Sequence, residues 1–208
     1  MCMTLKDTQL ARQAMDGLKQ KIVSKKEICN HLEKTINPKN TLALFRNLYE
    51  SKKMIYVWKQ YYYIRDAEEV EKNFNKMPPS EMIYLILNKL NIDWYLGLES
   101  ALEQNKIVWQ AINRNIIINS KFSGTFVILK HTFEFKKMRK DLLFGVHELK
   151  NPQSTTVKYS DVEKTLIDFV YYKKKVPLDL SNKKDKTKLK KYLLKVPKIL
   201  RQKVELNG

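Results

Sequence analysis

The sequence predicts an α+β protein built of two parts. Helical periodicity followed by a β-hairpin pattern fills the first 65 residues, and apolar helices followed by several β-prone runs fill most of the remainder. With 208 residues and 43% hydrophobic content, the chain can bury a core of ordinary size. We therefore expect a group of helices with a hairpin, followed by a domain of helices packed on a small, mostly antiparallel sheet.

Three helices are expected in the first 50 residues. Residues 5–22 repeat apolar side chains at helical spacing, which predicts a first helix with one buried face. Ser24 and Glu27 form a capping-box pattern that opens a second, short helix. Asn37-Pro38 then interrupts the periodicity, because the residue before a proline is pushed out of the α region. A third helix resumes at Lys39.

The third helix is amphipathic, and its outer face is expected to be polar and basic. The side chains expected to face inward are those of Leu42, Phe45, Leu48 and Tyr49, and those expected to face outward are Lys39, Asn40, Ala43, Arg46 and Asn47. Residues 54–58 and 61–65 are β-prone runs separated by two residues, which predicts a hairpin. Three helices followed by a hairpin is the element order of a winged helix-turn-helix, whose last helix enters the DNA major groove. The alternative is a small helical subdomain that packs on the rest of the chain.

A polar segment separates the two parts. Residues 66–76 contain little apolar material, and the run from Met77 to Ser80 contains two prolines. We expect a winged helix-turn-helix DNA-binding domain over residues 1–66, a linker over 67–79 and an α+β domain with a basic helical tail over 80–208. Within the latter, helices are expected at residues 81–90, 93–104, 164–172, 186–194 and 197–204, and strands at 115–119, 125–130, 132–135 and 142–146. Ser160 and Glu163 form a second capping-box pattern before the 164–172 helix.

The charge of the chain points to polyanions. The formal net charge is +18, and residues 171–208 hold 13 basic and 3 acidic side chains. Excess lysine and arginine favours nucleic acid, because binding releases the counterions of the phosphates. The alternative is a solvated surface of a lysine-rich protein. We expect the tail helix to pack on one face and to add non-specific attraction with its basic face.

A search for catalytic motifs gives mostly negative results. The five glycines never cluster into a phosphate-binding loop, and the two cysteines and three histidines are scattered, so no metal, cofactor or catalytic residue is expected. Glu134-Phe135-Lys136, on an expected strand, resembles the ExK triplet of metal-dependent nucleases, and a nuclease built on that sheet is the alternative function. Apolar runs of the length that a membrane span or a secretory signal needs are absent, which predicts a cytoplasmic protein without a membrane partner.

Three segments together resemble the AbiEi-type antitoxins and their relatives, which are transcriptional regulators of toxin–antitoxin systems. They are Lys59 to Ile64, similar to the end of the family's wing; Trp94 to Leu102, similar to an aromatic-rich helix; and Tyr159 to Asp168, similar to the family's "SPEKTLLDLL" segment. The chain departs from the family at Gln60, where glycine is usual, and at Val162, near the place of a proline.

The resemblance implies a non-enzymatic regulator that binds double-stranded operator DNA, represses its own operon and opposes a nucleotidyltransferase toxin. A stand-alone protein-interaction module is a further alternative. The residues expected to contact DNA are Lys25 and Lys26 at the start of the second helix, Lys39, Asn40, Thr41, Arg46 and Asn47 on the third, and Lys59 and Gln60 at the wing tip. Among these, Asn40, Arg46 and Asn47 are the expected base-reading residues, because amide and guanidinium groups can bond base edges bidentately.

Overall fold

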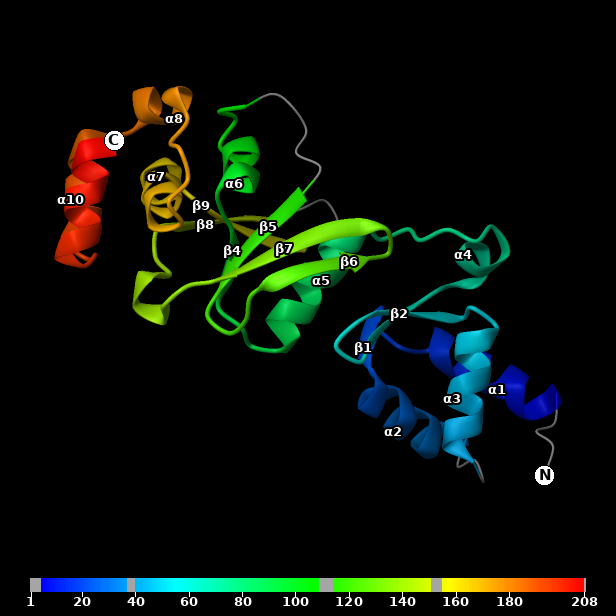
Figure 1. The fold of residues 1–208 in the computed structure, drawn as a ribbon. Coiled ribbons are helices and arrows are strands. Elements are labelled where there is room, and N and C mark those ends of the chain that lie inside the picture. The colour runs from blue at the N-terminus through cyan, green and yellow to red at the C-terminus, as the bar shows by residue number, and fades with distance from the viewer. Residues whose placement is uncertain (1–4, 37–39, 109–113, 151–154, 208) are drawn as a thin grey trace. The chain divides into compact units, whose positions relative to one another are not determined.

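The structure is a computed structural model, and it describes residues 5–36, 40–108, 114–150 and 155–207. The fold combines helices with two sheets (Figure 1), so the predicted α+β class is confirmed. The chain forms two compact units, Met1–Ile86 and Leu87–Gly208.

The N-terminal unit packs helices against a three-stranded antiparallel sheet of order β1-β3-β2. Its elements are α1 (Leu5–Asp16), β1 (Ile22–Ser24), α2 (Lys25–Ile36), α3 (Thr41–Glu50), β2 (Met54–Trp58), β3 (Tyr61–Ile64) and α4 (Ala67–Glu71), and α5 (Pro79–Lys89) crosses into the second unit. The core of this unit is formed by side chains of α1, α2, α3 and the sheet, among them Met15, Leu32, Leu48 and Met54. The predicted hairpin and the three predicted helices are present.

The first helix ends earlier than its periodicity predicts. Gly17 follows α1, and glycine is unfavourable inside a helix. Ile22, expected on the last turn of that helix, instead belongs to β1, where it pairs with Tyr63 and is buried. A strand of three residues is too short to show the alternating pattern of a strand. Leu18 and Ile22 happen to continue the helical spacing, and the predicted helix was therefore too long.

The expected linker contains a helix with a buried anchor. Asp66 caps α4 in a reciprocal capping box with Glu69. The Glu69 carboxylate is fully buried, and it accepts hydrogen bonds from the Tyr63 hydroxyl and from the backbone N–H of Asp66 at 2.9 Å and Lys76 at 2.7 Å. These bonds tie residues 66–76 to the hairpin, within the compact unit Met1–Ile86.

The C-terminal unit is a six-stranded mixed sheet of order β6-β7-β5-β4-β9-β8 with helices packed on it. Its elements are β4 (Trp94–Leu96), α6 (Glu99–Gln104), β5 (Arg114–Asn119), β6 (Gly124–Ile128), β7 (His131–Lys137), the 3-10 helix η1 (Lys140–Leu142), β8 (Val146–Lys150), β9 (Thr156–Ser160), α7 (Val162–Tyr171), α8 (Leu178–Lys183), α9 (Lys186–Leu193) and α10 (Lys198–Asn207). The β5/β7 and β4/β9 pairs are parallel, and the β4/β5, β6/β7 and β8/β9 pairs are antiparallel. A single core joins the sheet to α6, α7 and the three helices that follow.

Three predictions for this unit are wrong in detail. The helix expected over 93–104 is instead β4 followed by α6, and the strand expected over 142–146 is displaced to β8. Asp161, rather than Ser160, caps α7, since its carboxylate accepts from the Lys164 N–H at 2.8 Å. Ser160 lies within β9, and its hydroxyl is 2.8 Å from that of Thr165, so the second capping box does not form.

Candidate nucleic-acid interface

The start of α2 and the tip of the β2–β3 hairpin lie together. The capping box predicted for α2 is formed, because Glu27 Oε2 accepts from the Ser24 N–H at 2.7 Å and Ser24 Oγ accepts from the Glu27 N–H at 3.2 Å. The N–H of Lys25 donates to the carbonyl of Gln60 at 2.8 Å. The tip itself is a two-residue turn in which Lys59 and Gln60 both have positive φ, 48° and 64°. Lys25, Lys26, Lys59 and Gln60 are therefore brought to one exposed region.

The polar residues of α3 are mostly committed to local contacts. The Asn40 side chain caps α3 by accepting from the Ala43 N–H at 3.0 Å, and the Thr41 hydroxyl donates to Glu33 at 3.3 Å. Asn47 Oδ1 is buried without a hydrogen-bond partner, so Asn47 faces inward, contrary to the prediction. Lys39 lies outside the described residues. Three residues were expected to read bases. Asn40 instead caps α3 and Asn47 faces inward, whereas Arg46 is exposed.

The apolar stripe that α3 buries differs from the predicted one. Leu44 and Leu48 are buried, whereas Leu42 and Tyr49, expected inside, are 63% and 49% exposed. The helix carries two neighbouring apolar stripes. On the second stripe Phe45 is partly buried against the core, and the rings of Phe45 and Tyr49 contact that of Tyr62 in the hairpin.

This second stripe forms one side of a shallow concavity that we call the aromatic hollow. Its volume is about 480 Å³, and it is lined by Lys25, Leu42, Phe45, Arg46, Tyr49, Tyr56 and Tyr62. The Tyr62 ring is central, with the rings of Phe45, Tyr56 and Tyr49 edge-on to it at centroid distances of 5.1, 5.6 and 6.3 Å. Three elements, the start of α2, the outer face of α3 and the hairpin, thus converge on a cluster of four rings.

Positive charge borders the aromatic hollow. The Lys25 ammonium lies 5.4 Å from the centroid of the Phe45 ring, and Arg46 is exposed beside it. Burial, followed by the neighbouring Tyr56 and Tyr49 hydroxyls, raises the pKa of Tyr62, so that its hydroxyl remains a neutral donor at physiological pH. The hollow therefore offers ring surface, hydroxyl groups and two cations.

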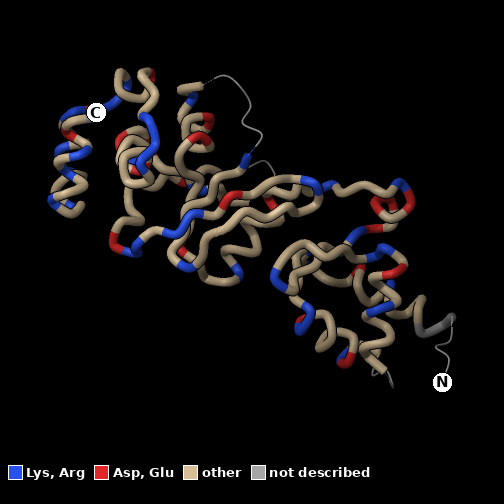
Figure 2. The backbone as a smooth tube through the Cα atoms, in the orientation of Figure 1, with Lys and Arg blue, Asp and Glu red and all other residues tan. Residues whose placement is uncertain are grey.

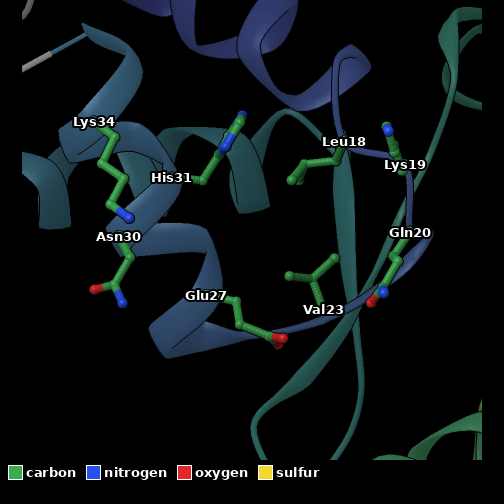
Figure 3. Close-up of a pocket in the computed structure, with 8 residues that line it drawn as sticks. All are labelled: Leu18, Lys19, Gln20, Val23, Glu27, Asn30, His31 and Lys34. Atoms are coloured by element: carbon green, nitrogen blue, oxygen red, sulfur yellow. The ribbon is translucent and has the colours of Figure 1, made fainter.

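A second hollow of the N-terminal unit is lined mostly by polar and charged residues. It has a volume of about 410 Å³, and residues 27, 30, 31 and 34 of α2 line it opposite residues 18, 19 and 20 and Val23 (Figure 3). His31 Nε2 lies 3.0 Å from the Ala14 carbonyl, which fixes it as an N–H donor that ties α2 to α1. Glu27 is held by the capping box. Among its described lining residues this hollow provides Lys19 and Lys34 as exposed cations, without tyrosine, phenylalanine or tryptophan rings.

The ExK triplet lies on β7 as predicted and forms an internal ion pair. Lys136 Nζ is 2.7 Å from Glu134 Oε1, and both line a hollow of about 350 Å³. Burial acts to raise the pKa of Glu134, but the Lys136 ammonium outweighs it and the pKa is lowered. Within the described residues no group of three or more His, Cys, Asp or Glu side chains is placed to hold a metal ion.

The residues that resemble the "SPEKTLLDLL" segment include a buried polar network. Lys164 and Asp168 of α7 are both completely buried and form an ion pair. The Tyr95 hydroxyl donates to the two Asp168 oxygens at 3.3 and 3.2 Å. Burial raises the pKa of Asp168 to about 6, although Lys164 acts against this. The four-residue spacing of the lysine and the aspartate in α7 is the sequence signal for an ion pair.

The tail packs on the start of α7, as expected. Lys188 of α9 lies 3.0 Å from Asp161 Oδ2 and 3.1 Å from Glu163 Oε2, and the Tyr192 hydroxyl donates to Asp161 at 2.6 Å. Leu189 and Leu193 are buried, while Lys190, Lys191 and Lys198 of the tail are exposed. Lysine and arginine recur along the backbone of the tail (Figure 2). In the part of the chain that the structure describes, no helix combines the length and apolarity required to cross a membrane.

Comparisons with known proteins add little. Neither the protein-family models nor the curated proteins match the chain. Among solved structures, the antibiotic-resistance factor ANT(2'')-Ia is similar to 61% of this chain over 86% of its own length, with 11% sequence identity and a TM-score of 0.35. A likeness at this level carries no argument about fold or function.

Proposed function

We propose that this protein is a cytoplasmic, non-enzymatic regulator that binds double-stranded DNA through its N-terminal unit. The observation that carries the proposal is the convergence of α2, α3 and the hairpin on one exposed surface bearing Lys25, Lys26 and Arg46. The order of elements and the β1-β3-β2 sheet fit a winged helix-turn-helix, in which α3 enters the major groove and the hairpin is the wing.

In this proposal, phosphates are bound by Lys25 and Lys26, where the N-terminal amides of α2 add a favourable dipole. Arg46 reads bases, since a guanidinium can bond the O6 and N7 atoms of guanine together. Asn40 and Thr41 orient the start of α3 through the bonds described above, and Asn47 contributes no base contact. Lys59 and Gln60, at the tip of the wing, contact the sugar-phosphate backbone of the DNA.

The antitoxin role is the part of the proposal that the sequence resemblance alone supports. It predicts that the neighbouring reading frame encodes a nucleotidyltransferase toxin whose growth inhibition is relieved by co-expression of this protein. The experiment compares the growth of cells that express the toxin alone with that of cells that express the toxin together with the wild-type protein. Undiminished inhibition in the presence of the folded protein would remove the antitoxin role and leave DNA binding untouched.

The DNA-binding proposal is tested by fluorescence anisotropy with a duplex from the protein's own promoter and a random duplex. Replacing Lys25 and Lys26 together by alanine should weaken binding and reduce the slope of log affinity against log salt by roughly 2, since each phosphate contact contributes about 0.9. Arg46→Ala should reduce the preference for the promoter by about tenfold, because a bidentate base contact is worth about 1–3 kcal/mol.

The matched control replaces Lys19 and Lys34 by alanine. This variant removes the same charge from the same unit, but from the second hollow (Figure 3). It should keep the wild-type salt slope. Equal losses in the two double variants would show that binding follows net charge rather than this surface. Incubation of both duplexes with magnesium or manganese separates the nuclease alternative, because a regulator retains the DNA uncut.

A further inference from the structure

The outer face of α3 is unusual for a helix that only reads paired bases. Major-groove readout uses hydrogen-bonding side chains directed at base edges. Here the exposed face carries Leu42 and Tyr49 beside Arg46, and the hairpin adds Tyr56, which is 45% exposed. In a duplex the faces of the bases are covered by stacking, so these rings could reach only base edges and methyl groups.

The chemistry of the aromatic hollow selects among ligands. Clusters of perpendicular rings also bind quaternary ammonium groups, by attraction between a cation and the ring faces. In this hollow that attraction is opposed by Lys25 and Arg46, since both line it and both are cationic. Among the described residues that line the hollow, none carries a carboxylate that would offset them. A ligand with a flat π-surface and a negative charge satisfies both the rings and the cations.

A nucleotide has this combination, and the volume of about 480 Å³ falls within the range of about 300–1,000 Å³ typical of small-ligand sites. We propose that the aromatic hollow accommodates an unpaired nucleobase of a bound DNA, stacked on Tyr49 and Tyr56, with its phosphate on Lys25 and Arg46. This inference rests on the proposed DNA binding and deepens it. It implies a preference for DNA with a bulged, extruded or terminal unpaired base over fully paired DNA.

The experiment compares three probes of one sequence: a paired duplex, the same duplex with a single bulged 2-aminopurine, and the single strand. Affinity is measured by anisotropy and stacking by 2-aminopurine fluorescence. Because stacking on an aromatic side chain favours binding by about fivefold or more per base, the wild type should prefer the bulged duplex by at least that factor and quench its fluorescence.

The decisive variant replaces Tyr49 and Tyr56 together by leucine, which keeps apolar volume but removes the rings. It should lose the preference for the bulge and the quenching while it binds the paired duplex as wild type does. The phenylalanine pair at the same positions should retain both. Phe74→Leu removes a ring of similar exposure from the same unit outside the hollow, and it should also retain both. Circular dichroism confirms that each variant is folded.

The outcomes separate this inference from the proposed function. Equal affinity for paired and bulged duplexes, or a preference that survives in the leucine variant, overturns the inference and leaves DNA binding in place. Failure to bind any probe overturns both. Binding of the single strand alone, lost in the leucine variant, supports the hollow as a base site and overturns double-stranded DNA as the ligand.

Discussion

Lys164 and Asp168 illustrate how a residue's chemistry depends on a context that the local sequence does not contain. Their spacing in α7 allows contact, as in any i,i+4 pair. On a surface helix such a pair would contribute little. Here the sheet and the helices that follow α7 bury it completely, and Tyr95, far away in the chain, supplies a hydroxyl to the carboxylate. The pair was visible in the sequence, but its burial was not.

Replacement of Lys164 by methionine should lower the free energy of unfolding by about 3–5 kcal/mol at pH 8, because the Asp168 carboxylate remains buried without its counter-ion. Burial raises the pKa of Asp168 from 3.8 to about 6, so its contribution to stability is full below 3.8 and is lost as the pH rises through 6. Without Lys164 that pKa rises further. The decrease in the free energy of unfolding that Lys164→Met causes, measured by urea unfolding, should therefore be smaller at pH 5 than at pH 8.

Lys188→Met is the matched control, since it removes the same group from a pair that is partly exposed. Its partners keep other donors, because Asp161 retains the Tyr192 hydroxyl and Glu163 retains the Asp185 N–H. A loss of about 1 kcal/mol or less is expected. The double variant Lys164→Met/Asp168→Leu should recover most of the stability of the single one. Identical losses for Lys164→Met at the two pH values would contradict this account.

At the scale of elements, patterns of adequate length predicted the structure and short ones did not. The hairpin, α2 with its capping box, α5, α7 and the tail helices each carry several periods or a specific cap. The strands β1 and β4 have three residues each, and a run that short has no measurable period. The sequence also did not predict which face of α3 is buried. The helix has two adjacent apolar stripes, and its packing against the neighbouring helices determines which of them is buried.

Gly97 lies between β4 and α6, where the segment expected to be one helix divides into a strand and a helix. A Cβ atom at this position would lie 2.2 Å from Cδ1 and 2.8 Å from Cγ1 of Ile118, on the neighbouring strand β5. Gly97→Ala should therefore lower the free energy of unfolding by about 1–3 kcal/mol, the usual cost of overpacking a core. Thermal or urea unfolding of the variant checks this.

Two further variants identify the cause. Ile118→Val removes the nearest clashing atom, so Gly97→Ala/Ile118→Val should be more stable than the sum of the two single changes predicts. Gly17→Ala adds the same methyl group at a distance of 3.4 Å from the Ala14 carbonyl oxygen, an ordinary van der Waals contact, and it should leave stability nearly unchanged. Additive losses in the double variant would show that the cost of Gly97→Ala arises from the backbone rather than from Ile118.

At the scale of the whole molecule, the sequence located the candidate surface better than it assigned its members. Element order and charge placed Lys25, Lys26, Arg46 and the hairpin tip in one region, and in the structure the start of α2 lies beside both Arg46 and the hairpin tip. The sequence predicted that Phe45 and Tyr49 of α3 face inward, whereas both line the aromatic hollow. The spacing of apolar residues along a helix does not distinguish a ring that fills a core from one that lines an open hollow, because the same spacing occurs in both cases.

The excess charge of the C-terminal tail gives a separate prediction about affinity. Lys190, Lys191 and Lys198 are exposed on or beside α9 and α10. If the tail adds only long-range attraction, replacing the three lysines by glutamine should weaken binding to the promoter and random duplexes by the same factor. The slope of log affinity against log salt should fall for both duplexes, and the ratio of the two affinities should stay unchanged.

Arg46→Ala should instead lower the ratio of the two affinities, with a smaller change in the salt slope. Anisotropy titrations of the two duplexes over a salt series provide both quantities. A changed ratio in the tail variant would mean that the tail reads sequence, and unchanged affinity for both duplexes would mean that its charge does not act on DNA.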